Sequence, residues 1–211
     1  MRRVSWFLLM AFVLSATNVL ADYEKLTKKN YEKSGNEKVV VIYGVNWGRK
    51  WGCAGFENAQ LQSLTFSRID AGSNSFDGET IALKTPSILF VDDVFNSHAI
   101  IVDPGEYALI GFDIKAAKSV RDVGHFIAKS KDLFKDGKAV AGTFTANAGE
   151  VVYIGEFGLD CVTNEPIPWR YYIEKADFDH FISGFKEEYK FMADKQVVYR
   201  LFQTDKIGTA P

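Results

Sequence analysis

The feature that most restricts the fold is a succession of short segments rich in β-branched and aromatic residues, spaced about ten residues apart and separated by turn sequences. VVVIYGV at 39–45 and YALIGFDI at 107–114 are two of these segments. Such residues favour strands, and turns at this spacing are typical of two packed antiparallel sheets. The sequence therefore predicts a mainly β fold, an antiparallel β-sandwich.

One late segment follows the periodicity of a helix instead. Between residues 177 and 192, five apolar side chains recur on one helical face: Phe178, Phe181, Ile182, Phe185 and Tyr189. Asp177 can accept hydrogen bonds from the free backbone N–H groups at the start of such a helix. We therefore predict an amphipathic C-terminal helix over 177–192 that packs its apolar stripe against the sandwich.

The chain begins with a segment typical of a secretory signal peptide. Two arginines precede an apolar run over 6–16, which is too short to form a membrane-spanning helix. Val19 and Ala21 then occupy the two small-residue positions of a cleavage site. Residues 1–21 are therefore predicted to be removed, and the protein is predicted to be exported, either to a periplasm or out of the cell.

Two parts are expected after the signal peptide. Residues 22–37 are polar and lysine-rich, which predicts a short helix or a loose arm, and residues 38–211 are expected to form a single sandwich domain. The full chain has a formal net charge of −2. A weakly acidic chain without a basic cluster argues against nucleic acid and anionic membranes as partners. No later apolar run is long enough to span a bilayer.

The chain has two cysteines, Cys53 and Cys161. An even pair in an exported protein predicts one disulfide, and neither cysteine lies in the CxxC motif of redox proteins. The disulfide would attach the glycine-rich loop NWGRKWGCAG, at 46–55, to the strand that ends near Cys161. The glycines of this loop predict irregular structure throughout it.

Two aromatic clusters are candidates for ligand binding. The candidate residues are Trp47, Arg49 and Trp51 in the glycine-rich loop, and Trp169, Arg170 and Tyr172 further along the chain. The predicted disulfide would bring both clusters into one neighbourhood. Exposed indole and guanidinium faces could stack on a sugar ring or grip a peptide, which predicts a carbohydrate or a peptide/protein ligand. In the alternative interpretation, the tryptophans are buried and cover the end of the sandwich core.

The sequence contains no recognisable catalytic motif. The histidines His98, His125 and His180 lack metal-ligand spacing, and neither a GxSxG nucleophile turn nor a glycine-rich phosphate loop occurs. The adjacent Asp92 and Asp93 fit a solvated loop better than a calcium site. We therefore predict no metal and no cofactor, and we expect each histidine to be a surface residue or a hydrogen-bonded core residue.

Two similar segments, DPGEYALIGF at 103–112 and NAGEVVYIGEF at 147–157, each place a turn before a strand that contains an aromatic residue. The turn residues predict a hairpin or a corner at each place. In this respect residues 99–161 resemble a set of exported bacterial proteins with a prealbumin-like or carboxypeptidase-regulatory-like β-sandwich. The resemblance implies a non-enzymatic protein of the cell envelope and supplies no catalytic residues. Many members of that set carry a lipid-attachment cysteine after the signal, and this sequence has none.

Three hypotheses for function follow. The leading one is an exported, non-enzymatic binding or structural protein of the cell envelope or extracellular space. The alternative is a secreted carbohydrate-active or other hydrolase, in which carboxylates from Glu150, Glu156 and Asp160 assemble near the tryptophan-rich loop. The third is a protein that docks an exposed edge strand onto a larger assembly.

Overall fold

The structure is a computed structural model of the chain, and it describes residues 23–70, 75–87, 91–162, 166–171 and 175–204. The predicted signal peptide at 1–21 lies outside the described residues. Within the described part of the chain, no helix is long and apolar enough to cross a membrane.

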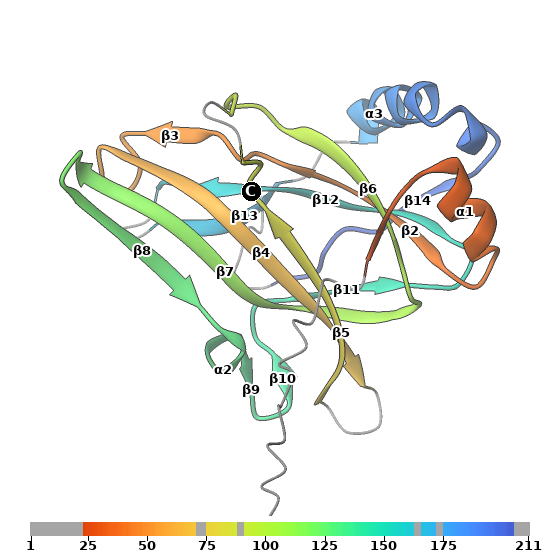
Figure 1. The fold of residues 1–211 in the computed structure, drawn as a ribbon, viewed down its shortest axis with the longest axis horizontal. Coiled ribbons are helices and arrows are strands. Elements are labelled where there is room, and N and C mark those ends of the chain that lie inside the picture. Colours follow the sequence, from red (N-terminus) through yellow and green to blue (C-terminus); the bar gives the residue numbers. More distant parts are fainter. Residues whose placement is uncertain (1–22, 71–74, 88–90, 163–165, 172–174, 205–211) are drawn as a thin grey trace, which may run out of the picture.

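Two six-stranded sheets form the body of the described chain (Figure 1). The first, called the β2 sheet here, has the order β1 (Glu24–Lys25), β6 (Asn96–Val102), β2 (Val39–Val45), β12 (Val151–Asp160) and β13 (Ile167–Tyr171), and β14 (Val197–Tyr199) also pairs with β12. The second, the β4 sheet, has the order β11 (Thr143–Ala146), β7 (Gly105–Ser119), β4 (Asn58–Asp70) and β3 (Arg49–Trp51), with β5 (Ser75–Lys84) paired to β4 and β8 (Asp122–Ala128) paired to β7. A short helix α2 (Ser130–Leu133) and a small hairpin of β9 (Phe134–Lys135) and β10 (Lys138–Ala139) follow β8. The predicted mainly β, sandwich-like fold is confirmed.

The direction of β12 departs from a purely antiparallel sandwich. Most strand pairs are antiparallel, but β12 runs parallel to both β2 and β14. Between β6 and β12 the chain passes through the β4 sheet, so β12 enters the β2 sheet from β11 of the other sheet and is not joined to β2 or β14 by a tight turn. Parallel neighbours need such a long connection, because a two-residue turn can join only antiparallel strands.

Both turns predicted as hairpins or corners are corners. Residues 103–104 lead from β6 in one sheet to β7 in the other, and residues 147–150 lead from β11 to β12 in the opposite sense. In the second corner Gly149 has a φ of 76°, a backbone conformation that glycine adopts without steric cost. Each corner therefore places two consecutive strands in opposite sheets, on either side of the core.

The two sheets pack against each other through a shared hydrophobic core. The inward side chains of β2 include Val41 and Tyr43, which are 1% and 5% exposed. At the centre of the core, the Phe66 ring lies edge-on to the rings of Phe144 and Phe157, with centroids 5.7 Å apart in each pair. All seven residues of β2 are buried, because its other face is also covered.

Helix α3 (Lys175–Glu188) and the following 3-10 turn η1 (Lys190–Met192) cover the outer face of the β2 sheet (Figure 1). Phe178 and Phe185 are buried there against side chains of β2 and β12, so the predicted apolar stripe and its packing are confirmed. The predicted helix limits are wrong, because α3 begins at Lys175 and its continuation tightens into 3-10 geometry. Asp177 therefore lies within the helix and is not its N-cap.

The polar arm forms ordered structure along the edge of the β2 sheet. Helix α1 (Lys28–Ser34) begins after Thr27, whose Oγ1 accepts a hydrogen bond from the backbone N–H of Asn30 at 3.1 Å. Leu26 is 5% exposed and packs into the core under the helices. Strand β1 pairs with β6 opposite Ile100 and Ile101, and the Leu26 N–H donates to the Ala99 carbonyl, so among the described strands none pairs with residues 96–98 on that side.

Candidate ligand cleft and the predicted aromatic loop

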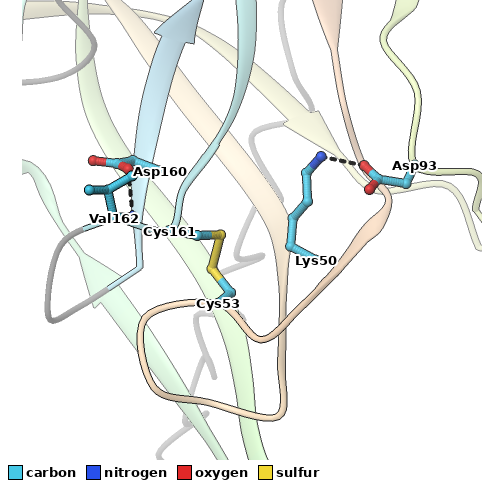
Figure 2. Close-up of a disulfide and its surroundings, with 6 residues drawn as sticks. All are labelled: Lys50, Cys53, Asp93, Asp160, Cys161 and Val162. Atoms are coloured by element: carbon cyan, nitrogen blue, oxygen red, sulfur yellow. Dashed lines mark hydrogen bonds and ion pairs between the residues drawn. A yellow bond between two sulfur atoms is a disulfide. The ribbon is translucent and has the colours of Figure 1, made fainter.

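The glycine-rich loop is held at both ends (Figure 2). The predicted disulfide between Cys53 and Cys161 is confirmed, with the two Cα atoms 4.6 Å apart. At the other end, Lys50 Nζ lies 2.5 Å from Asp93 Oδ1, and the Asn46 side-chain amide donates to the same oxygen at 2.8 Å. Part of the loop is regular, because β3 pairs with β4, so the prediction of irregular structure throughout it is wrong.

The two loop tryptophans face opposite environments. Trp47 is 3% exposed and belongs to the core between the sheets, because it continues the alternation by which Tyr43 and Val45 point inward from β2. Trp51 is 67% exposed, and the Arg49 guanidinium carbon lies 5.6 Å from the centroid of its ring. The exposed pair is a cation–π contact worth about 0.5–1 kcal/mol. Burial of Trp47 agrees with the core interpretation, and exposure of Trp51 agrees with the ligand interpretation.

The second aromatic cluster lies on the neighbouring strand β13. The backbone of Trp169 is paired with Gly158 of β12, and that of Arg170 with Phe157. Phe157 is in turn the partner of Val45 on β2, so one strand separates the backbones of the two clusters. The side chains of Trp169 and Arg170, and all of Tyr172, lie outside the described residues, so the combined ligand face stays a prediction.

The three candidate carboxylates are spread along β12. Glu150 makes two hydrogen bonds with Arg200, at 2.7 and 3.1 Å, which lower the pKa of its carboxyl to about 2. Asp160 is buried at the far end, about 30 Å away for a strand of this length, and accepts a hydrogen bond from the backbone N–H of Val162 (Figure 2). Burial raises the pKa of Glu156, which lies opposite Gly44 on the outer face. Glu156 therefore has the raised pKa that a general acid needs. The hydrolase hypothesis stays a prediction.

Two other features could mark a functional site: a cluster of titratable side chains that could bind a metal, and an open strand edge that could dock onto a partner. In the part of the chain that the structure describes, no group of three or more His, Cys, Asp or Glu residues is placed to hold a metal ion. Strand β8 pairs with β7 on one side, and its Val123 and Ile127 are 45% and 56% exposed. Among the described strands, none pairs with the other side of β8, which is therefore an edge of the kind that the docking hypothesis requires. That hypothesis stays a prediction.

A cleft of about 610 Å³ lies between the edges of the two sheets. One wall is the first half of β6, which β1 leaves uncovered, and the other is the end of β5, from Ala82 to Lys84. The Tyr23 hydroxyl donates to the backbone carbonyl of Ala82 at 3.4 Å and so links the arm to the opposite sheet. The aromatic side chains that line the cleft are Tyr23, Tyr43, Trp47, His98 and Tyr189.

His98 and Tyr43 lie side by side in the wall of the cleft. They are paired residues on β6 and β2, and their rings stack with centroids 5.4 Å apart. The Nε2 atom of His98 is buried and has no hydrogen-bond partner among the described residues. Burial and the nearby Lys25 lower the pKa of His98, and Glu188 opposes them, so the ring is neutral at pH 7. An unpaired buried polar atom costs about 1–3 kcal/mol, which favours any molecule that supplies a partner.

Three tyrosines, Tyr23, Tyr43 and Tyr189, line the same cleft. Burial raises the pKa of Tyr43, and the neighbouring Tyr23 and Tyr189 raise it further. Burial and the carboxylate of Glu188 raise the pKa of Tyr189 to about 12. The hydroxyls of Tyr43 and Tyr189 are therefore protonated at pH 7 and can act as hydrogen-bond donors.

Sequence reasoning identified only Trp47 among these aromatic residues of the cleft. The others come from the arm, from β2, from β6 and from the segment after α3, and no local spacing connects them. His98 differs from the expectation of a surface or hydrogen-bonded core residue, because its Nε2 is buried without a partner. Comparison of the chain with models of protein families, with curated proteins and with solved structures finds no match.

Proposed function

We propose that the protein is an exported, non-enzymatic binding protein that takes a small, ring-bearing organic molecule into the cleft between β5 and β6. The observation that carries the proposal is the cleft itself, about 610 Å³ and lined by five aromatic rings, one of which carries an unpaired buried nitrogen. Ligand sites in proteins commonly enclose about 300–1,000 Å³ and combine apolar rings with a few polar groups that orient the ligand.

Export is the second part of the proposal. It is supported by the signal-like segment at 1–21 and by the Cys53–Cys161 disulfide, since disulfides persist mainly in oxidising compartments. A relation to the prealbumin-like or carboxypeptidase-regulatory-like sandwiches belongs to the same proposal. Its support is the pair of similar corner-and-strand segments, in which a turn leads the chain from one sheet to the other.

The cleft is a better supported site than the glycine-rich loop. The loop hypothesis needs two exposed tryptophans for a carbohydrate or a peptide, but Trp47 is buried and only Trp51 offers a free ring face. A single exposed ring with one arginine beside it provides little of the area that holds a ligand. Trp47 instead contributes to the wall of the cleft.

The test uses three probes that share a biphenyl body: biphenyl-4-carboxylate, biphenyl-4-methanol and biphenyl-4-methylammonium. Isothermal titration calorimetry on the oxidised protein should show saturable 1:1 binding of at least one of them. Ser97 is exposed and lines the cleft, so Ser97→Phe should block it and weaken binding by about tenfold or more.

The matched control is Thr145→Phe, on an exposed position of β11 that does not line the cleft. It should leave the affinity unchanged. Absence of binding for all three probes, or equal weakening by both variants, would overturn the assignment of the cleft as the binding site.

A further inference from the structure

We propose that the natural ligand of the cleft is an organic anion, an apolar ring system that carries a carboxylate or a similar acidic head. This inference rests on the proposed function and adds the charge of the ligand to it. It follows from the buried hydrogen-bond donors and the two lysines that line the cleft.

Two buried polar groups of the wall can donate hydrogen bonds. Burial keeps the Tyr43 hydroxyl protonated, because it raises the pKa of the phenol. The neutral ring of His98 carries one N–H, and in the tautomer with hydrogen on Nε2 the unpaired atom is a donor. Two donors at buried positions favour a ligand with acceptor oxygens, since hydrogen bonds to a charged acceptor are roughly twice as strong as neutral ones.

The lining offers little negative charge for a cation to bind. Glu188 lines the cleft, and it lies close enough to Tyr189 to raise the pKa of that phenol. It is the one acidic side chain among the described residues of the lining. A cationic ligand would therefore find a single carboxylate in the described lining.

Two lysines stand on opposite sides of the cleft. Lys25 comes from β1 and Lys84 from β5, and both side chains are exposed at residues that line it. Lys25 lies close enough to His98 to lower the pKa of that ring. With two lysines and one glutamate, the lining carries a formal charge of +1 (2 − 1) at pH 7. These charges attract an anion into the cleft and oppose a cation, and a neutral polyol gains nothing from them.

The experiment compares affinities within the biphenyl series, in which only the head group changes. At pH 7 and moderate ionic strength, biphenyl-4-carboxylate should bind about tenfold more tightly than biphenyl-4-methanol, and biphenyl-4-methylammonium should bind most weakly. The double variant Lys25→Gln/Lys84→Gln should reduce the preference for carboxylate over alcohol to about threefold or less, with the affinity for the alcohol unchanged. Both lysines are exposed, so this variant should fold normally.

The matched control is Lys115→Gln/Lys135→Gln, which removes two exposed lysines from the β4 sheet and the β9 hairpin, away from the cleft. It should keep the full preference for the carboxylate. Tyr43→Phe removes a single oxygen and keeps the ring in the wall. It should weaken binding of the carboxylate probe more than binding of the alcohol, which would indicate a direct contact between the Tyr43 hydroxyl and the head group.

The outcomes separate the two proposals. Equal affinity for all three probes would overturn the anionic ligand and leave the proposed function standing. Binding of the ammonium probe in preference to the carboxylate, or tighter binding of a neutral oligosaccharide such as cellotetraose, would overturn it as well. If no probe binds, the proposed function fails and the anionic ligand fails with it.

Discussion

The opposite environments of Trp47 and Trp51 make a direct test of the fold, because the same truncation at the two positions should have very different costs. Trp47 is 3% exposed within the core between the sheets, and Trp51 is 67% exposed. A buried tryptophan removes about 200 Å² from water, and at about 25 cal/mol per Å² its transfer contributes about 5 kcal/mol. Truncation of a buried tryptophan to alanine typically costs about 3–5 kcal/mol. We therefore expect Trp47→Ala to lower the free energy of unfolding by about 4 kcal/mol.

The exposed tryptophan should contribute little. Only about a third of the Trp51 surface is buried, and its contact with Arg49 is an exposed cation–π pair. We expect Trp51→Ala to cost about 1 kcal/mol or less. For a domain of this size, a change of 1 kcal/mol shifts Tm by about 2–4 °C, so the two variants should differ by roughly 10 °C.

Urea denaturation of the oxidised protein, followed by far-UV circular dichroism, measures the free energies of unfolding of both variants under the same conditions. Thermal melts of the same samples give the Tm values. Similar losses for the two variants would refute the inward alternation from β2 into the loop. A larger loss for Trp51→Ala would also refute the placement of Trp47 in the core between the sheets.

Three further predictions concern the loop and the strand ends. The double variant Cys53→Ser/Cys161→Ser opens a link between residues 108 apart, and urea denaturation should show a loss of about 2–4 kcal/mol; an unchanged midpoint would contradict a stabilising bridge. Arg200 holds the folded pKa of Glu150 at about 2, below the unfolded value of about 4.3, so this stability is present above pH 4.3 and is lost as the pH falls towards 2. In stability measurements between pH 6 and pH 2, Arg200→Met should remove about 1–2 kcal/mol of that pH-dependent loss, and an unaltered profile would count against the pair. Gly48→Ala would place a Cβ 2.4 Å from the Asp93 Cα and should cost about 1–3 kcal/mol, whereas Gly124→Ala meets open space and should be nearly neutral; equal melting temperatures for the two would argue against close packing at Gly48.

The placement of the two tryptophans shows where local patterns suffice. Side chains alternate along a strand, so a β2 that continues past Val45 sends Trp47 inward with Tyr43. The alternation stops at Gly48, whose Cα lies against the backbone of Asp93, and β3 starts a new register. The outward direction of Trp51 therefore depends on how β3 pairs with β4, which no pattern within the loop specifies.

The cleft depends on contacts between segments that are far apart in the chain. Its wall needs β1 to pair with only part of β6, and it needs β5 to occupy the facing edge of the other sheet. The stacking of Tyr43 on His98 follows from the register between β2 and β6. His98 alone, read in its sequence, resembles any other histidine in a strand.

The sequence by itself determined the elements and one covalent link. Strand-forming runs, the apolar stripe of α3 and the two corner turns are local, because side-chain periodicity and turn chemistry act within a few residues. With two cysteines in the chain, only one intramolecular disulfide was possible. The tertiary structure alone decided the parallel direction of β12, the partners of each sheet edge and the convergence of Tyr23, Tyr43, His98 and Tyr189 on one cleft. These features arise from long-range strand pairing, whose register and order are set by the packing of the whole core and are not encoded in any single segment.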